Sequence, residues 1–448
     1  FMFKDDEEKL YVTRRSAPLV IGYGKKDVFV GSDAVSLSNL IESVIFLDED
    51  DVAIVSKKQT NIYDKFGERV NRKKKSVDLN SDIISKGNYQ HFMLKEIHEQ
   101  PEVFGYATSS FINFKTHKIE MLNEIKELDN VDRLIFVACG TAYYACAVAK
   151  FWFEKYVKVP VEIDVASEFR YRDTPFSKNE YAIFVSQSGE TADTLAALRK
   201  VKGKVNKTIS IVNVVESSIA RESEFVLPIK AGPEIGVAST KAFTAQLAVL
   251  ACLAINFSNK RGLISRKENS ELIDELVSVP GIMSNIIKKT PIYKEFAKKL
   301  MKAKNALFFG RGILYPLALE AALKLKEISY IHAEGYPSGE LKHGPIALVD
   351  KKMPVICFAP VNNLFEKTIS NVQEVQARNG KVLLITDDEG ASCLNSSEIS
   401  MIKLPKFSNF ISPIIYAIPS QLIAYYTALY KGTDIDKPRN LAKSVTVE

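Results

Sequence analysis

Short apolar runs alternate with helical stretches through the middle and the end of this chain. The runs have the length and β-branched composition of buried strands, and they fall into two series. The first series covers residues 134–138, 161–165, 181–185, 208–212 and 225–229, and the second covers 306–309, 354–359, 382–386 and 401–404. Because buried strands that alternate with helices form parallel sheets covered on both faces, the pattern predicts two tandem, doubly wound α/β domains.

The first 75 residues follow a different pattern, with short runs at 10–13, 18–22, 28–31, 45–47 and 52–55 separated by turn residues. This spacing is typical of antiparallel strands, so we expect a β-rich unit. The polar and basic segment from Asn71 to about residue 82 predicts a solvated linker. A helical stretch then begins at Phe92 and is expected to end at Pro101, because proline lacks the N–H that a helix interior needs.

A chain of 448 residues is too long for a single core, so several domains are expected. We divide it into a β-rich unit at 1–75, a linker and lead helix at 76–128, a first α/β domain at 129–290, a second at 291–435 and a polar tail at 436–448.

Composition narrows the classes of function. The net charge of +6 is small, and no basic block with interleaved aromatic residues is present, so nucleic acid is not an expected partner. The five histidines show no metal-ligand spacing, and we expect neither a metal nor a cofactor. The five cysteines form no Cys-x-x-Cys pair and are expected to be reduced, buried thiols of a cytoplasmic protein. We count no apolar run of membrane-spanning length, and so expect no membrane partner.

The segment Ser186-Gln187-Ser188-Gly189-Glu190-Thr191 lies between a predicted strand and a predicted helix. Unpaired N–H groups at a helix start, the helix dipole and hydroxyl side chains together form an anion cradle. The segment contains no Lys or Arg, which suits a sugar monophosphate better than a polyphosphate with its metal. Alternatively, it is a serine-rich turn whose side chains only cap the helix.

A second group of candidates could carry out proton chemistry on a phosphosugar. Glu327 follows Lys324 by three residues on one helix face, so the ammonium can set the charge and position of a carboxylate that moves a proton between adjacent carbons. The alternative is an exposed ion pair of little consequence. Arg311 and Glu320 are expected to form a supporting ion pair behind Lys324.

His343 lies between glycines in a loop and could act as a general acid or base for ring opening, or be a turn histidine bonded to the backbone. His332 is expected to be structural and partly buried. Lys443 is either a solvated tail lysine or, if the tail folds over the site, an amine that adds to a sugar carbonyl. Gly140-Thr141 and Val237-Ala238-Ser239 follow other predicted strands and could complete the phosphate and hydroxyl contacts.

Six strings together resemble the glutamine:fructose-6-phosphate aminotransferase family. They are Cys139–Thr141, Ser186–Thr191, Gly236–Lys241, Leu323–Ser329, Glu340–Pro345 and the terminal Pro438–Glu448. The resemblance covers essentially the whole chain, and the terminal string is close to diagnostic. Residues from about 85 onward resemble the isomerase half of that family, which consists of two sugar-isomerase (SIS) domains and a C-terminal tail, and residues 1–75 resemble the end of its glutaminase half.

The resemblance implies a role for each matched residue. The phosphate and neighbouring sugar oxygens of fructose 6-phosphate would be held by Thr141, Ser186, Gln187, Ser188 and Thr191, with Val237, Ser239 and Ala442 nearby. Lys443 would form a Schiff base with carbon 2, and Glu327, assisted by Lys324, would move a proton between carbons 1 and 2. His343 would open the ring from the other subunit of a homodimer with a shared active site. Ammonia, derived from glutamine, would give glucosamine 6-phosphate.

Two departures from the family pattern change what we expect. Ala142 replaces a serine that the family usually carries, which predicts weakened phosphate affinity. No cysteine precedes Cys139, whereas the glutaminase half starts with a cysteine nucleophile, so this chain alone should not hydrolyse glutamine and is expected to be part of a longer enzyme. Two alternatives stay open: a free-standing, ammonia-dependent phosphosugar isomerase or deaminase, and a non-catalytic phosphosugar-binding module.

Overall fold

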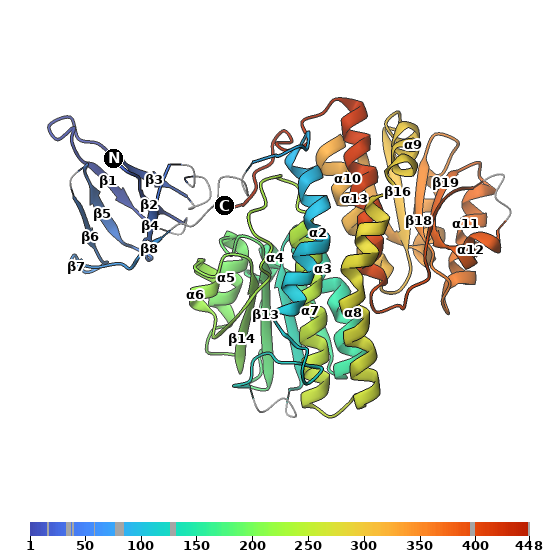
Figure 1. The fold of residues 1–448 in the computed structure, drawn as a ribbon, viewed down its shortest axis with the longest axis horizontal. Helices are drawn as coiled ribbons and strands as arrows, with labels where there is room; N and C mark the ends of the chain where they lie inside the picture. The colour runs from blue at the N-terminus through green and yellow to red at the C-terminus, as the bar shows by residue number, and fades with distance from the viewer. Residues whose placement is uncertain are drawn as a thin grey trace.

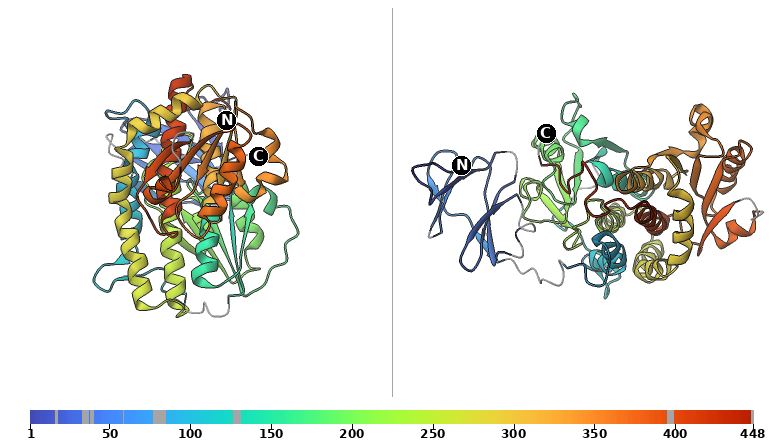
Figure 2. Two further views of the ribbon diagram at one scale, coloured as in Figure 1. Left: turned by 90° about the vertical axis from the view of Figure 1, so that its right-hand side faces the viewer. Right: turned by 90° about the horizontal axis from the view of Figure 1, so that it is seen from above.

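Three structural units follow one another along the longest axis of the molecule (Figure 1). The structure is a computed structural model that describes residues 1–446 except 16–17, 33–36, 38–39, 58, 77–84, 126–130 and 395–398. A β-rich unit lies at one end, a first α/β unit lies in the middle, and a second α/β unit lies at the other end. The view from above shows the same order (Figure 2).

Two antiparallel sheets make up the β-rich unit, and Ile21, Ile45 and Ile62 lie in the buried cluster of this unit. The first sheet contains β1 (Leu10–Thr13), β5 (Val52–Val55), β6 (Thr60–Tyr63) and β7 (Arg69–Val70). The second contains β3 (Val28–Gly31), β2 (Val20–Tyr23), β4 (Ser43–Phe46) and β8 (Lys74–Ser76). The expected solvated linker is therefore wrong for β8, which pairs with β4; residues 77–84 of that linker lie outside the described residues.

Each α/β unit contains a five-stranded parallel sheet, and the two sheets share one strand order. In the first, the order is β12 (Val161–Val165), β11 (Arg133–Ala138), β13 (Glu180–Ser186), β14 (Lys207–Val212) and β15 (Phe225–Pro228). In the second, it is β17 (His332–Pro337), β16 (Asn305–Gly310), β18 (Pro354–Phe358), β19 (Lys381–Asp387) and β20 (Ser400–Leu404). The predicted fold class, two tandem α/β domains with parallel sheets after a β-rich unit, is confirmed.

Helices cover both faces of each sheet, and one layer of them lies between the two sheets (Figure 1). This middle layer contains α2 (Phe92–Ser109), α3 (Gly140–Trp152), α7 (Lys241–Lys260), α8 (Arg266–Ile287), α10 (Leu314–Ser329) and α13 (Ser412–Lys431). The remaining described helices are α4 (Ala166–Phe169), α5 (Ala192–Val201), α6 (Ser218–Glu222), α9 (Thr290–Leu300), α11 (Phe365–Gln376) and α12 (Asp388–Ser392), the π-helical segment Phe153–Val157, and the 3₁₀ helices Ser338–His343 and Pro345–Leu348. A hairpin of β9 (Ile112–Asn113) and β10 (Lys118–Ile119) follows α2.

The expected end of the lead helix at Pro101 is wrong, because α2 continues through this proline to Ser109. Proline leaves the carbonyl of Ile97 without its helical N–H donor. The Gln100 side chain takes over this role, since its Nε2 donates to Ile97 O at 3.1 Å and to Gln421 Oε1 at 2.8 Å. A buried glutamine next in sequence thus allows the helix to accommodate the proline.

Helix α7 is, among the described residues, long and apolar enough to span a membrane, so our count of apolar runs was wrong on this point. Its apolar window is 94% buried inside the protein, and it packs against α2, α3 and α8. The apolar composition of α7 is explained by its position in the shared helical layer.

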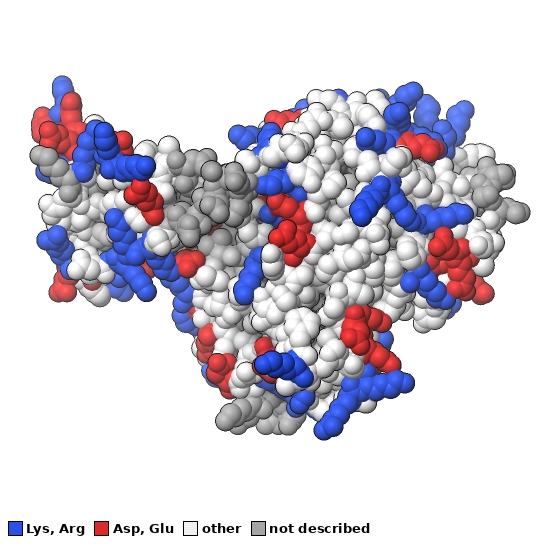
Figure 3. Space-filling model, viewed as in Figure 1, with Lys and Arg blue, Asp and Glu red and all other residues white. Residues whose placement is uncertain are grey.

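Two surface properties complete the description. Lys, Arg, Asp and Glu side chains are interspersed over the face drawn in Figure 3. All five cysteines are free; Cys146, Cys252 and Cys357 are buried and Cys139 is half-buried, but Cys393 is exposed, so the expectation of burial is wrong for that thiol.

Candidate active site

The loops after β11 and β13 separate at the carboxyl edge of the first sheet. Helix α3 follows β11 and packs on one face of the sheet, whereas α5 follows β13 and packs on the other (Figure 1). Ligands of such sheets bind where two neighbouring strands send their connections to opposite faces. The predicted anion cradle, residues 186–191, lies at this point.

Within the cradle, side chains and backbone hold a tight turn. Ser186 Oγ accepts a hydrogen bond from Gly189 N at 3.0 Å and lies 3.0 Å from Thr191 Oγ1, while Glu190 N donates to Ser188 Oγ at 3.1 Å. Gly189 has a φ of 66°, and a Cβ at this position would lie 1.9 Å from Ser217 Oγ. Only glycine fits this turn, because the conformation is strained for other residues and the space is already filled.

The C-terminal tail lies directly against the cradle. Ser444 Oγ lies 3.0 Å from Ser188 Oγ, and Ala192 N, at the start of α5, donates to Val445 O at 3.0 Å. Further back, the Asp436 carboxylate accepts from Phe92 N and Met93 N at the start of α2. The tail is therefore attached at both ends, which fixes the position of Lys443 between them.

Lys443 is bound by Glu234, a residue that the sequence did not single out, and by Gly236, the first residue of the Gly236–Lys241 string. Its Nζ lies 2.6 Å from Glu234 Oε2 and donates to Gly236 O at 2.8 Å. The Lys443 side chain is 25% exposed, whereas the Glu234 side chain is fully buried. An acidic residue just before the buried helix α7 was the available signal, but its partner lies far away in sequence.

A ladder of three charged residues on α10 forms the second part of the site. Glu320, Lys324 and Glu327 lie on one helix face, with Lys324 Nζ 3.6 Å from Glu320 Oε1 and 2.5 Å from Glu327 Oε2. Lys324 and Glu320 are buried, and Glu327 is 20% exposed. Thr141, at the start of α3, donates to Glu320 Oε1 at 3.2 Å, so the ladder of the second unit contacts the first unit.

Burial changes the ionisation of this ladder. Burial raises the pKa of Glu320 to about 8, although the charge of Lys324 opposes the rise. Burial alone would lower the pKa of Lys324, but Glu320 and Glu327 outweigh it and raise that pKa. Burial therefore favours the neutral form of Glu320, whereas the neighbouring carboxylates favour the charged form of Lys324.

Two expectations about this region are wrong. Arg311 donates through Nη2 to Asn371 Oδ1 at 2.9 Å, and Glu320 contacts Lys324 and Thr141, so these two described residues do not form the expected ion pair. His332 is not partly buried: its side chain is 66% exposed and lies 3.3 Å from Glu334 Oε1 at the start of β17. Glu320 thus contacts Lys324 directly, whereas Arg311 binds Asn371.

The remaining candidate residues differ in burial and in their contacts with the cradle, the ladder and Lys443. Val237 and Ser239 are half-buried in the segment between Gly236 and α7, and Val237 N donates to Asp436 O at 3.0 Å. Ala442 is exposed next to Lys443, and Ala142 is buried in the first turn of α3. His343 is exposed at the end of a 3₁₀ helix, and the described structure gives it no hydrogen bond to the cradle, the ladder or Lys443.

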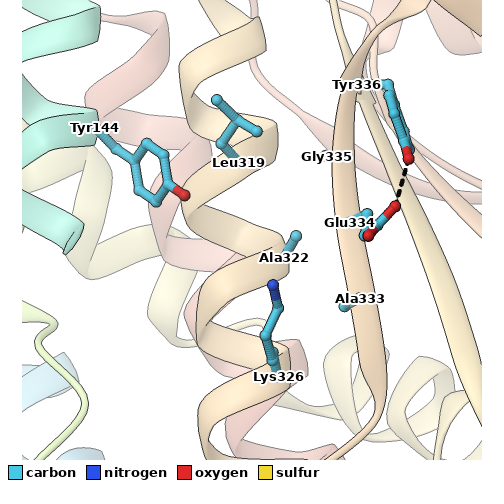
Figure 4. A pocket seen from close by; sticks show the side chains of 8 residues that line it. All are labelled: Tyr144, Leu319, Ala322, Lys326, Ala333, Glu334, Gly335 and Tyr336. Carbon is cyan, nitrogen blue, oxygen red and sulfur yellow. Dashed lines mark hydrogen bonds between the residues drawn. The ribbon is translucent and has the colours of Figure 1, made fainter. Parts of the chain in front are cut away.

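Two hollows on the surface of the described residues lie away from the cradle, the ladder and Lys443. The one in Figure 4, of about 280 Å³, is lined by residues of α3, α10 and β17: Tyr144, Leu319, Ala322, Lys326, Ala333, Glu334, Gly335 and Tyr336. A second, of about 500 Å³, is lined by Tyr106, Ser109, Ser110 and Lys230. Neither lining includes a predicted site residue, whereas the chain's own tail contacts the cradle through Ser444 and Val445.

Comparisons with known proteins agree with this arrangement. The SIS domain family matches residues 127–256 and 299–431. Two curated relatives are glutamine–fructose-6-phosphate aminotransferases [isomerizing]: that of Bradyrhizobium diazoefficiens is 49% identical and that of Brucella abortus 50% identical, each over 100% of this chain and 74% of the relative.

Solved structures give the same result. The C-terminal domain of the Francisella tularensis glucosamine-fructose-6-phosphate aminotransferase has a TM-score of 0.77 at 42% identity and covers 79% of this chain and 99% of that domain. Glucosamine-6-phosphate deaminase of Thermotoga maritima has a TM-score of 0.61 at 25% identity, over 79% of this chain and 99% of that one. With two SIS domains and close relatives along its whole length, the chain belongs to the glutamine–fructose-6-phosphate aminotransferase [isomerizing] family.

Proposed function

We propose that this chain converts fructose 6-phosphate and ammonia into glucosamine 6-phosphate through a Schiff base on Lys443. The observation that carries this proposal is the position of the tail. Ser444 contacts Ser188 of the cradle at 3.0 Å, and the adjacent Lys443 is held by Glu234 and Gly236. A primary amine at the mouth of an anion cradle suits a phosphosugar with a reactive carbonyl.

The cradle would bind the phosphate. Its donors are backbone N–H groups at the start of α5 and the hydroxyls of Ser186, Ser188 and Thr191, with Gln187 and Thr141 for neighbouring sugar oxygens. No Lys or Arg lies in residues 186–191, so the dipole of α5 and neutral donors would carry the interaction. Val237, Ser239 and Ala442 lie on the segments that flank Lys443 and would border the bound sugar.

The ladder on α10 would move the proton. In the proposed reaction Lys443 forms the imine at carbon 2, which acidifies the hydrogens on carbon 1. Glu327, partly exposed and paired with Lys324, then transfers a proton between carbons 1 and 2. Lys324 would hold Glu327 in place.

Ring opening would need a second copy of the chain. His343 is exposed on its own subunit and is not bonded to the described site residues, so we assign it to the site of a partner subunit in a homodimer. We further propose the unit boundaries 1–75, 76–128, 129–290, 291–435 and 436–448, a cytoplasmic location, and glutamine as the source of ammonia in the longer enzyme. The relatives extend beyond this chain, which spans 74% of their length.

The competing function is a deaminase or isomerase that uses the same carboxylate, and the likeness to the Thermotoga deaminase favours keeping it as a candidate. Borohydride reduction in the presence of fructose 6-phosphate tests the lysine. Wild type is expected to become covalently labelled, and Lys443→Ala is expected to lose the label. Equal labelling of the two proteins would contradict the Schiff-base assignment, and formation of glucosamine 6-phosphate from ammonia would separate amination from simple isomerisation.

A further inference from the structure

A fully buried carboxylate faces the tail lysine, and the mechanism above gives it no role. Glu234 Oε2 lies 2.6 Å from Lys443 Nζ. Its other oxygen, Oε1, accepts from Thr240 N at 2.9 Å and from Ala242 N at 3.0 Å, at the start of α7. One oxygen is therefore committed to the helix start, and the other is directed at the amine.

The surroundings keep Glu234 ionised. Burial opposes ionisation, but Lys443 and the N–H donors of Ala242 and Thr240 outweigh it and lower the pKa of Glu234 to about 2. The positive end of the α7 dipole acts in the same direction. A fixed negative charge thus lies against Lys443 throughout the pH range in which an enzyme of this kind works.

A second buried carboxylate supports the segment from behind. Glu96 of α2 accepts from Ile235 N at 2.5 Å and Gly236 N at 3.1 Å through Oε1, which orients the Gly236 carbonyl that Lys443 contacts. Burial and the charge of Glu234 raise the pKa of Glu96 to about 7. From α10, Lys324 is close enough for Glu234 to raise its pKa. Among the described residues, the charged groups that interact with the Glu234–Lys443 pair include Glu96 and Lys324.

We propose that Glu234 is a catalytic residue, the counter-ion that holds positive charge on the Lys443 nitrogen from the free ammonium through to the imine, and that Glu96 is a positioning residue for it. This role rests on the proposed Schiff base. The protonated imine carries its charge on the same nitrogen as the ammonium, so one carboxylate at 2.6 Å stabilises both. A protonated imine withdraws electrons from carbon 1 far better than a neutral one, which is what Glu327 requires.

The proton balance needs no further reagent. One ammonium proton passes to the carbon 2 carbonyl oxygen as the nitrogen adds to carbon 2, so that the C–N bond forms and the carbonyl becomes a hydroxyl. A second proton moves from nitrogen to this hydroxyl, and the C–O bond breaks to release water. The net change is ammonium plus ketone to protonated imine plus water, with Glu234 ionised throughout.

The test is the pH profile of borohydride trapping with fructose 6-phosphate, because borohydride reduces the protonated imine. In Glu234→Gln the amide oxygen can still accept from Thr240 N and Ala242 N, but the charge is gone. We expect at least tenfold less trapping at neutral pH, and an upper pH limit of trapping at least one unit lower than in wild type. Glu234→Asp keeps the charge farther from Nζ and should lower that limit by less.

Controls separate this role from folding and from the mechanism on which it rests. Glu180→Gln removes a buried carboxylate paired with Arg133 at the opposite edge of the sheet and should leave the profile unchanged. Glu96→Gln should reduce the amount trapped without moving the pH limit as far as Glu234→Gln does. If label depends on Lys443 but Glu234→Gln or, where that variant does not fold, Glu234→Asp keeps the wild-type pH limit, the counter-ion assignment is overturned alone. If wild type gives no Lys443-dependent label, the Schiff base and the counter-ion are overturned together.

Discussion

At the scale of single residues, the candidate site is organised by buried charge. Lys324 lies between Glu320 and Glu327, and Lys443 lies between Glu234 and the carbonyl of Gly236. Each ammonium contacts a carboxylate that is itself hydrogen-bonded, Glu320 by Thr141 and Glu234 by the N–H groups of Thr240 and Ala242, which is how a buried charge is tolerated. Both amines are therefore placed before any substrate arrives.

Glu320→Gln should make the stability of the protein less dependent on pH. The pKa of Glu320 is raised to about 8 in the fold, above its ordinary value of 4.5. Between these values the unfolded carboxyl ionises and the folded one does not, so stability is lost as pH rises through this window. We expect the loss between pH 5 and pH 9 to shrink by roughly 1–3 kcal/mol in the variant. Thermal unfolding at the two pH values measures it; Glu295→Gln, at an exposed pair, is the control.

Glu327→Gln should separate binding from turnover. The amide keeps the shape of the side chain beside Lys324 but cannot accept a proton from carbon 1. We expect turnover to fall by roughly 10²–10⁴-fold, while the dissociation constant for fructose 6-phosphate changes only a few fold. Steady-state kinetics and calorimetric binding give the two values. Normal turnover would show that another group moves the proton.

The residues of the site differ in how far the sequence could reveal them. Lys324 and Glu327 are visible because helix spacing places them on one face. Glu234 and Glu96 could not be found in this way, because each is defined by a partner in another element: Glu234 by the tail and Glu96 by the segment before α7. The predicted Arg311–Glu320 ion pair was wrong because Arg311 has another partner. Its guanidinium donates to Asn371 of α11, which the sequence did not place beside it.

At the scale of elements, the two parallel sheets were predicted from the sequence, whereas their strand order and several details were not. Alternating strands and helices predicted both parallel sheets. Strand β17 (His332–Pro337) was missed because a half-exposed edge strand has no apolar run. Pro101 was treated as a helix end because the sequence does not show that the Gln100 side chain, which also contacts Gln421 of α13, donates to the carbonyl of Ile97.

Gly189→Ala should destabilise the cradle by more than the backbone strain of a positive φ alone would. An alanine Cβ would meet Ser217 Oγ at 1.9 Å, in addition to the strain of a φ of 66°. Gly203→Ala is the matched control, since Gly203 has a φ of 76° and no atom within 4 Å of the added Cβ. We expect the control to cost about 1 kcal/mol and Gly189→Ala to cost at least about 2 kcal/mol more. Thermal unfolding and fructose 6-phosphate binding test this; equal effects of the two substitutions would contradict it.

At the scale of the whole molecule, a buried arginine connects the β-rich unit to the segment next to the cradle, beside the ion pair between Lys75 and Glu216. Arg14 is 3% exposed, and its guanidinium donates to Leu47 O within its own unit and to Ser218 Oγ of the first α/β unit. Ser218 N in turn donates at 2.9 Å to the carboxylate of Glu190 in the cradle. The two units therefore share a hydrogen-bonded contact next to the candidate phosphate site.

Arg14→Met should loosen this connection. The variant leaves Leu47 O and Ser218 Oγ without their donor, which costs about 1–3 kcal/mol. We expect faster proteolytic cleavage between the β-rich unit and the first α/β unit, and a β-rich unit that unfolds at a lower temperature than the rest. Arg15→Met, at the exposed neighbouring position, is the control. Cleavage at the wild-type rate would show that the arginine does not join the units.

The attachment of the tail also has a consequence for how the enzyme comes into being. A ribosome completes both sheets and the shared helical layer before it reaches residue 443, so a nascent chain can fold almost entirely while still lacking its amine. With the proposed Schiff base on Lys443, premature termination, a frameshift or a protease that trims this end would each remove the reacting amine and leave both sheets in place. The proposal therefore makes catalytic competence a late event in the synthesis of the polypeptide, and an intact reading frame a condition for activity.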